Sequence, residues 1–287
     1  MINIDIENDS CIKCGRCVKV CPTVIFGQET AKSEVDIHHI ETCISCGHCV
    51  SVCPTGSVIH SDFPPQKVHK IDADLLASPE QVMALIKSRR SYRAFSKQAI
   101  PIEVLEQILE AAHSAPTAEN LQQVQFTLVT DPEVLHKVSA ATISIFSSIV
   151  TKVYNPLIKP LVKLVNPEGY KQVSHLRDLV DDFTNAKKDR ILRGSTALIL
   201  IHTPKDVRFG RQDANLAYQN GSLMAESLGV GQFYTGFICA ASDMVKKSPV
   251  AKLLNIEGTI HAGMALGMPT FEYPNYVNKK DIVITRF

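Results

Sequence analysis

The sequence has almost no excess charge of either sign. Its 30 lysine and arginine residues face 29 aspartate and glutamate residues, for a formal net charge of +1. Such a chain has no bulk electrostatic attraction to nucleic acid or to an anionic membrane, so neither partner is expected. No run of about 18 uncharged apolar residues is present, so no membrane span is expected either. The segment MINIDIENDSC lacks a basic region followed by an apolar run, and we expect no secretory signal there.

Signatures of several enzyme classes are also missing. No G-x-S-x-G or H-E-x-x-H pattern occurs, so the hydrolases that these motifs mark have no support. No G-x-G-x-x-G pattern indicates a Rossmann dinucleotide site. The composition itself, with 45% hydrophobic and 21% charged residues, excludes wholesale disorder. At 287 residues, the chain is long enough for one or two domains.

The nine cysteines are distributed very unevenly. Eight lie between Cys11 and Cys53, and Cys239 stands alone, most simply as a small buried apolar residue. The segments CIKCGRCVKVCPT and CISCGHCVSVCPT agree at ten of thirteen positions and begin 32 residues apart, which is an internal duplication. Because no export signal is visible, the compartment is expected to be reducing, and the crowding indicates metal binding rather than disulfides.

Each copy has the pattern C-x2-C-x2-C-x3-C-P, which is typical of [4Fe-4S] ligation in which the fourth thiolate serves the other cluster. Zinc, the alternative, usually takes two C-x2-C pairs at wider spacing. The clusters would hold together a segment too small to rely on a core of its own. His48 and His60 are expected on its surface. The predicted ligands are Cys11, Cys14, Cys17 and Cys53 for the first cluster, and Cys43, Cys46, Cys49 and Cys21 for the second.

On these motifs, residues 1–62 closely resemble the bacterial two-[4Fe-4S] ferredoxins, which carry single electrons. Residues 63–78, with Pro64-Pro65 and mixed polar residues, are predicted to be an extended linker. Beyond it, helices are expected from Pro79, from Pro101 and over 213–228. Strands are expected over 125–130, 196–203, 260–267 and 281–287. Because helices and strands do not alternate as regular βαβ units, the fold class is predicted to be α+β.

Three short clusters have the chemistry to bind a phosphorylated, planar cofactor. RRSYRAF (89–95) offers arginine forks and a serine hydroxyl for a phosphate, although a basic helix end is the simpler interpretation. SAPTAENLQ (114–122) offers side-chain amides that can pair with a ring edge, unless it is an ordinary loop. GVGQFYTG (229–236) offers glycines that allow close backbone approach, or that simply cap a helix.

The order and separation of these clusters, followed by ALGMP (265–269), closely resemble the nitroreductase family of FMN flavoproteins over about residues 80–287. The resemblance implies that residues 79–287 form an α+β domain with a mixed or antiparallel sheet flanked by helices. It also implies a homodimer with FMN in the subunit interface. NAD(P)H, as a co-substrate, would bind directly on the flavin.

The resemblance also implies which residues contact FMN. The first motif holds the phosphate and ribityl chain, the second approaches the isoalloxazine, and the third lies along the flavin face near N5 and O4. A late basic residue completes the phosphate site. In that order the residues are Arg89, Arg90, Ser91 and Arg93; Asn120 with Gln122; Tyr234, Thr235 and Gly236; and Lys279 or Lys280, where the family more often has arginine.

Three further points concern this site. Arg93 is the candidate for stabilising negative charge on reduced flavin, the alternative being that it only holds the ribityl chain. The family usually continues its second motif as Gln-Pro-Trp, whereas Gln122 is followed here by Gln123-Val124, so the aromatic that shapes the pocket is absent. Thr117 stands where the family commonly has serine.

Residues 140–193 are longer than a simple connection. An apolar helical stripe from Ile143 to Val153 is followed by a proline-punctuated stretch with several lysines and then by a polar helix. A lid over the flavin or a dimer contact is favoured. A helix lying on a membrane surface is the alternative, and the absence of net positive charge argues against it.

Together, the two halves predict an FMN-dependent oxidoreductase that passes electrons between iron–sulfur clusters, FMN and an organic acceptor such as a nitroaromatic or quinone. The donor is either NAD(P)H or a reduced external ferredoxin. One alternative is an electron-transfer or redox-sensing module that relays electrons to a protein partner. Another is a flavin-using dehalogenase or flavin-fragmenting enzyme. Oxygen-sensitive clusters would suit the cytoplasm of an anaerobe.

Overall fold

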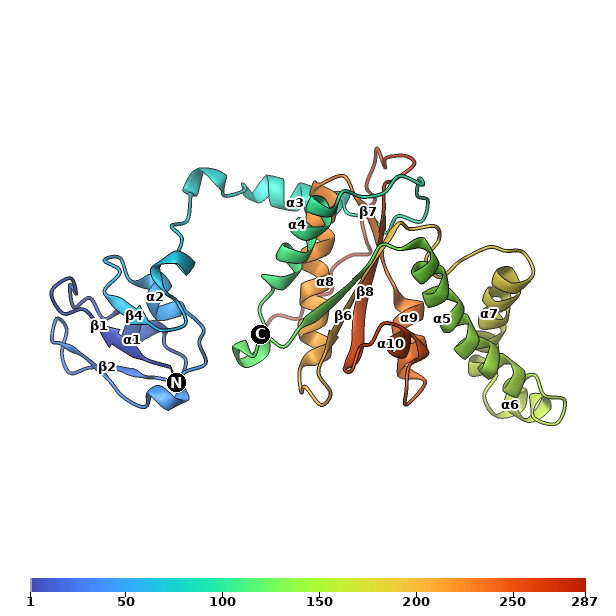
Figure 1. The fold of residues 1–287 in the computed structure, drawn as a ribbon, viewed down its shortest axis with the longest axis horizontal. Coiled ribbons are helices and arrows are strands. Elements are labelled where there is room, and N and C mark those ends of the chain that lie inside the picture. The colour runs from blue at the N-terminus through green and yellow to red at the C-terminus, as the bar shows by residue number, and fades with distance from the viewer. Residues whose placement is uncertain (1) are drawn as a thin grey trace. The chain divides into compact units, whose positions relative to one another are not determined.

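The computed structural model describes residues 2–287 as two compact units (Figure 1). Unit 1 comprises the chain up to Ala77 together with the short segment Ala118–Leu121. Unit 2 comprises Ser78–Thr117 and Gln122–Phe287. The grouping of Ala118–Leu121 with unit 1 was not expected from the sequence, which places this segment within the second domain.

Unit 1 reproduces the duplication in its secondary structure. Strand β1 (Ile4–Ile6) pairs antiparallel with β4 (Val58–His60), and β2 (Phe26–Gln28) pairs antiparallel with β3 (Val35–Ile37). Each cysteine motif forms one short helix, α1 (Arg16–Val20) or α2 (His48–Val52). Four 3-10 turns complete the described part of the unit: η1 (Ile40–Thr42), η2 (Pro65–Lys67), η3 (Ala73–Leu75) and η4 (Ala118–Asn120).

The two short helices begin at equivalent glycines. Gly15 and Gly47 have left-handed backbone conformations, with φ of 66° and 71°. Only glycine adopts this conformation readily, so these residues allow the chain to turn sharply between the second and third cysteines of each motif. The core beneath is small, and four of its buried members are Ile4, Ile25, Phe26 and Val58.

Unit 2 is built on a four-stranded antiparallel sheet. Its strands are β5 (Gln125–Val129), β6 (Ala197–Thr203), β7 (Gly231–Tyr234) and β8 (Thr259–Gly267), in the order β5-β6-β8-β7. β6 is buried along its whole length, as expected for an apolar run in the middle of a sheet covered on both faces. The sheet and its helices confirm the predicted α+β class.

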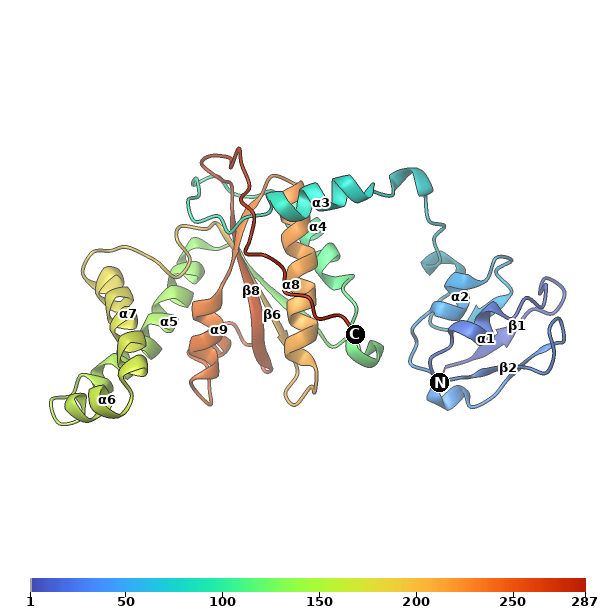
Figure 2. The same cartoon turned by 180° about the vertical axis from the view of Figure 1, so that it is seen from behind.

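Helices cover both faces of this sheet (Figure 2). On one side are α4 (Ile102–His113) and α8 (Gly210–Ser227), with α3 (Pro79–Ser88) contacting α8. On the other are α5 (Pro132–Val153), α9 (Gly236–Asp243) and α10 (Pro249–Leu253). Side-chain caps fix two of the helix starts: Ser78 forms a capping box with Gln81, and Asp131 accepts N–H bonds at the start of α5.

Residues 140–193 form the end of α5, then α6 (Lys159–Val165) and α7 (Pro167–Thr184), which packs along α5. By length and hydropathy, α5 meets the criteria for a helix that crosses a membrane. It is instead a core helix, because Leu135, Val138 and Phe146 lie buried in the main apolar cluster of unit 2. α5 is therefore not a membrane span.

The strand expected over residues 281–287 is wrong. This segment has no secondary structure and is exposed, with Ile282 and Val283 at 83% and 95% accessibility. Its alternating apolar residues resemble a strand, but no sheet edge among the described residues pairs with its backbone. The local pattern cannot supply that pairing, which a strand requires.

Candidate cofactor sites

The eight clustered cysteines surround two separate cavities in unit 1. One is lined by Cys21 from the first motif together with Cys43, Cys46 and Cys49 from the second. The other is lined by Cys53 from the second motif together with Cys11, Cys14 and Cys17 from the first. We call them the second and first cysteine cavities, respectively. This is the crossed grouping expected from the sequence, and it arises because α1 and α2 pack against each other.

The thiols do not converge on a single point. Among residues 2–287, no group of three or more histidine, cysteine or acidic side chains converges closely enough to hold one metal ion. A tetrahedral zinc would bring four sulfurs to about 2.3 Å from one point. A cubane instead spreads its four thiolates over four irons, so each sulfur stays well apart from the others.

Hydrogen-bond donors already face the sulfurs. The backbone N–H of Ile25 donates to Cys21 Sγ at 3.3 Å, and the hydroxyl of Thr23 lies 3.7 Å from the same sulfur. In the second motif, the hydroxyl of Thr55 occupies the equivalent position, 3.6 Å from Cys53 Sγ. Burial alone would raise the pKa of the Cys21 and Cys53 thiols, but these hydrogen bonds outweigh it and lower both pKa values. At Cys49, burial prevails and raises the pKa to about 11. Donors of this kind suit sulfur that carries negative charge.

The first flavin motif lines a basic cleft in unit 2. Arg89, Arg90, Ser91 and Arg93 surround a cleft of about 510 Å³, completed by residues of the C-terminal segment. The cleft offers three guanidinium groups and one hydroxyl as donors, and none of its lining residues is a carboxylate. This donor set suits a phosphate. The further lining residues are Tyr273, Asn275 and Val277.

Gln232 on β7 holds this motif in place, a role that the local sequence around Gln232 does not indicate. It is fully buried, and its backbone oxygen accepts the N–H of Tyr92 at 2.9 Å. Its side-chain nitrogen donates to the Arg90 carbonyl at 3.3 Å, while its side-chain oxygen accepts the Tyr218 hydroxyl at 2.8 Å. The backbone that carries the arginines is therefore fixed from the sheet.

Phe95 fixes the other end of the motif. It bridges to Pro269, and its ring stacks on Phe233 with centroids 6.1 Å apart. Gly267 in β8 lies directly beneath the ring, since a Cβ added there would come within 2.7 Å of Phe95 Cδ1. Only a residue without a side chain fits between this ring and the sheet.

Replacing Gly267 with alanine is therefore expected to destabilise unit 2 by about 1–3 kcal/mol, because Phe95 must leave its preferred position. Thermal unfolding monitored by circular dichroism measures the change. Combining Gly267→Ala with Phe95→Leu relieves the clash, so the double variant should lose less stability than the two single losses combined. An unchanged melting temperature for Gly267→Ala would show that the packing is not tight.

Arg93 lies in a wider basic group that the motif did not reveal. Its guanidinium donates to the Ser91 carbonyl at 3.3 Å. Burial, together with the nearby charges of Arg93 and Arg190, lowers the pKa of Arg193. Arg193 comes from the loop before β6, about a hundred residues away in the chain, so only the fold brings these like charges together. The carboxylate of Asp189 acts in the opposite direction on the same pKa and partly balances these charges.

The third flavin motif forms the end of β7 and the start of α9. The Tyr234 hydroxyl donates to the His261 carbonyl at 3.0 Å, and its ring packs edge-on against Tyr218 at 4.8 Å. Burial raises the pKa of Tyr234 and raises that of Tyr218 to about 12, so both are neutral at pH 7. Thr235 is buried with its N–H on the Gly263 carbonyl, and Gly236 opens α9.

The second flavin motif is divided between the two units. Asn120 belongs to unit 1, where its side-chain nitrogen donates to the carbonyls of Ile44 at 3.0 Å and Ser45 at 2.8 Å. Gln122 belongs to unit 2, and its N–H donates to the Thr117 hydroxyl at 3.0 Å. Both residues have left-handed φ values, 51° and 52°. Such values are uncommon outside glycine and often mark functional loops.

The two late lysines lie in the C-terminal segment that also contributes to the basic cleft. Lys279 and Lys280 are exposed and follow the residues that line it. Cys239, the ninth cysteine, is buried in α9, and burial raises its pKa to about 11. The thiol is thus protonated near neutral pH and is a packing residue, as the sequence suggested.

The fold and these sites define a redox protein of two units, one with paired cysteine cavities and one with a basic cleft beside an antiparallel sheet. The nitroreductase family model matches residues 86–268, and a 4Fe-4S dicluster domain model matches residues 10–58. The chain belongs to the nitroreductase family and carries an N-terminal 4Fe-4S dicluster domain.

Solved structures share the fold of unit 2. A nitroreductase with bound FMN from Bacteroides fragilis superposes with a TM-score of 0.54 at 20% identity, covering 72% of this chain and 99% of that chain. A BluB-like flavoprotein from Clostridium difficile 630 superposes with a TM-score of 0.53 at 19% identity, covering 71% and 99%. At this identity the likeness concerns the fold.

Curated relatives match over shorter segments. Human iodotyrosine deiodinase 1 is 29% identical over 70 residues, which is 24% of this chain and 24% of that protein. A putative NADH dehydrogenase/NAD(P)H nitroreductase of Archaeoglobus fulgidus is 44% identical over 62 residues, 22% of this chain and 36% of that protein. The chain thus spans about a quarter to a third of the length of these curated relatives.

Proposed function

We propose that this protein is an FMN-dependent oxidoreductase that passes electrons between two [4Fe-4S] clusters, FMN and an organic acceptor such as a nitroaromatic or a quinone. One observation carries the proposal. The same chain holds two four-cysteine cavities and, in a nitroreductase-family domain, a cleft lined by three arginines. Packing alone explains neither feature, because four cysteines around one cavity are a ligand set for a cluster and clustered arginines repel one another unless an anion is bound.

The cysteines of each cavity are the proposed ligands of one cluster. Cys11, Cys14, Cys17 and Cys53 bind the first, and Cys21, Cys43, Cys46 and Cys49 bind the second. Since each cluster takes one ligand from the other motif, binding both clusters ties the two halves of unit 1 together. This cross-linking compensates for the small core of the unit.

The arginine cleft is the proposed phosphate site of FMN. Arg89, Arg90 and Ser91 donate to the phosphate, and Lys279 or Lys280 adds a charge from the C-terminal segment. Arg93, supported by Arg193, holds positive charge where the reduced ring needs it. FMN itself supplies the exchange between one-electron and two-electron chemistry.

The remaining proposed contacts surround the ring. Tyr234, Thr235 and Gly236 lie along it, with the N–H groups at the start of α9 available to the ring edge. Asn120 and Gln122 are the proposed contacts of the isoalloxazine from the second motif. We propose a homodimer, working in the cytoplasm of an anaerobe, with an external ferredoxin as a partner in electron exchange.

The electron donor is the first property to test. The purified protein is kept anaerobic, its flavin and iron absorbance are recorded, and NADH or NADPH is added. Prompt bleaching of the flavin would identify a pyridine nucleotide as the donor. A flavin that stays oxidised until reduced ferredoxin is supplied would identify the clusters as the entry point. A purified protein that binds neither iron nor FMN would contradict the proposal.

Two other functions are distinguished by the same preparation. A reductive dehalogenase is favoured by the local matches to iodotyrosine deiodinases, and 3-iodotyrosine in the acceptor panel tests it. A relay to a protein partner without small-substrate turnover would show full reduction of flavin and clusters, but no catalytic consumption of any nitroaromatic, quinone or halogenated acceptor.

A further inference from the structure

The two halves of unit 1 carry different side chains at the equivalent strand ends near the cysteines. The 32-residue offset that aligns Cys11 with Cys43 also aligns Lys13 with Ser45 and Gln28 with His60. Gln28 ends strand β2, and His60 ends strand β4. The same place in the fold therefore carries an amide in one half and an imidazole in the other.

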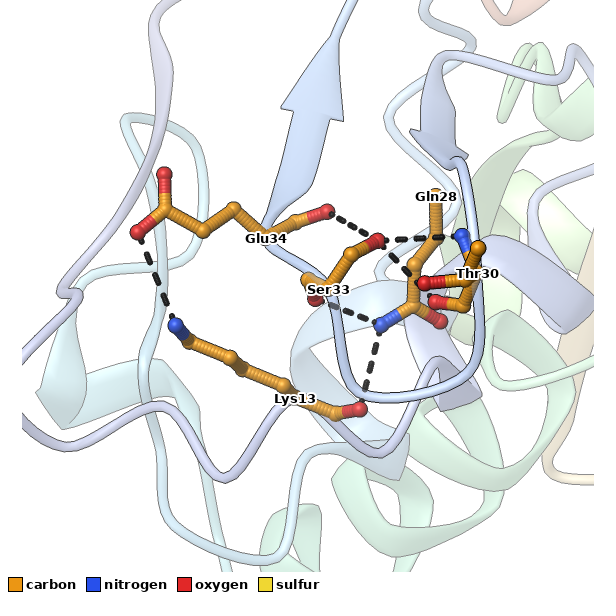
Figure 3. Close-up of polar contacts among 5 residues, drawn as sticks. All are labelled: Lys13, Gln28, Thr30, Ser33 and Glu34. Carbon is orange, nitrogen blue, oxygen red and sulfur yellow. Dashed lines mark hydrogen bonds and ion pairs between the residues drawn. The ribbon is translucent and has the colours of Figure 1, made fainter.

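Gln28 uses its amide on the backbone of the first half. Its side-chain nitrogen donates to the carbonyl of Lys13 at 3.1 Å and to that of Ser33 at 2.8 Å (Figure 3). A primary amide carries two N–H groups, so both are engaged by these carbonyls. Gln28 consequently has no donor left for a cysteine sulfur.

His60 instead faces a cysteine of the second cavity. Its Nε2 lies 3.5 Å from Cys43 Sγ. The backbone N–H of Asp62 donates to Nδ1 at 3.1 Å, so Nδ1 is an acceptor and the ring proton belongs on Nε2, facing the sulfur. The imidazole is buried at 3% exposure, contrary to the expected surface position, and packs against Phe63.

Asn120 takes over in the second half the role that Gln28 has in the first. Its amide donates to Ser45 O, the equivalent of Lys13 O, and to the adjacent Ile44 O. Because Asn120 already donates to the carbonyls of Ile44 and Ser45, the side chain at position 60 does not have to bind them. The histidine at this position is therefore free to direct its Nε2–H to the sulfur of Cys43.

Building on the proposed cluster binding, we infer that His60 makes the cluster of the second cysteine cavity the one with the higher reduction potential. Adding an electron increases the negative charge on the sulfurs, so an N–H donor stabilises the reduced form more than the oxidised form. The threonine hydroxyls near Cys21 and Cys53 occur in both halves and do not distinguish the clusters. The first electron to enter unit 1 therefore resides on the second cluster.

The test is a reductive titration of the full-length, cluster-loaded protein at constant pH, followed by electron paramagnetic resonance. The parent protein should show two one-electron midpoints. His60→Gln, which copies the first half, should lower only the upper midpoint. The reduced-to-oxidised ratio of that cluster at a fixed potential should fall about tenfold, which corresponds to 59 mV for one electron. His48→Gln, an exposed histidine between Cys46 and Cys49, should change neither midpoint.

Three results would overturn the inference alone: coincident midpoints in the parent with two clusters bound, an unchanged upper midpoint in His60→Gln, or an equal shift in His48→Gln. Too little iron for two clusters would overturn the proposed function as well. If His60→Gln fails to hold its clusters, the parent labelled with 15N-histidine and poised at the upper midpoint decides the matter. A histidine nitrogen coupled to the reduced cluster in electron–nuclear double resonance supports the inference, and its absence overturns it.

Discussion

Replacing Cys21 and Cys46 together with serine is expected to remove one cluster and leave the other intact. The two residues come from different motifs but line the same cavity, so the second substitution damages a site that the first has already damaged. Replacing Cys14 and Cys21 together should instead remove both clusters, because these residues come from the same motif but line different cavities. Iron and sulfide analysis of anaerobically reconstituted protein measures the outcome.

The two double variants separate crossed from local ligation. If each motif bound its own cluster, the result would be reversed: the Cys14 and Cys21 pair would spare one cluster and the Cys21 and Cys46 pair would spare none. Cys239→Ser is the matched control, since this buried cysteine lies in unit 2 and its loss should leave the iron content unchanged. Retention of full iron by both double variants would rule out cysteine ligation of clusters altogether.

Arg89→Ala is expected to weaken FMN binding about 10- to 100-fold, because a charge-assisted hydrogen bond to a phosphate contributes about 1.5–3 kcal/mol. Riboflavin, which lacks the phosphate, should bind the parent and the variant equally. Titration of the flavin-free protein, followed by quenching of flavin fluorescence, gives both affinities. A variant that binds FMN as tightly as the parent would contradict the placement of the phosphate in the basic cleft.

Two comparisons sharpen this experiment. Arg177→Ala removes an exposed arginine that pairs with Asp181 on α7, and should leave FMN binding unchanged. Lys279→Ala and Lys280→Ala should each have a smaller effect than Arg89→Ala, because solvent and salt screen exposed charges. A larger loss in one of the two lysine variants would identify which lysine closes over the phosphate.

Much of the fold follows from short-range patterns. The run at 197–203 is apolar at nearly every position, which fits a central strand, and Ser78-Pro79 with Gln81 specifies a helix start by itself. The β7 strand was missed because four residues beginning with glycine carry no detectable alternation. The C-terminal strand was wrong because alternation alone does not provide a pairing partner.

The sequence by itself determined the class of fold, and it predicted the two sets of four cysteines and the basic motif. These features depend on residues close together in the chain, where spacing and geometry are directly linked. Only the tertiary structure decided that Gln232 fixes the arginine motif, that Arg193 approaches Arg93, and that His60 and Asn120 reach the Cys43–Cys46 loop. Each of these contacts joins residues far apart in the sequence, and it exists only because burial of apolar surface brings separate elements into one packed arrangement.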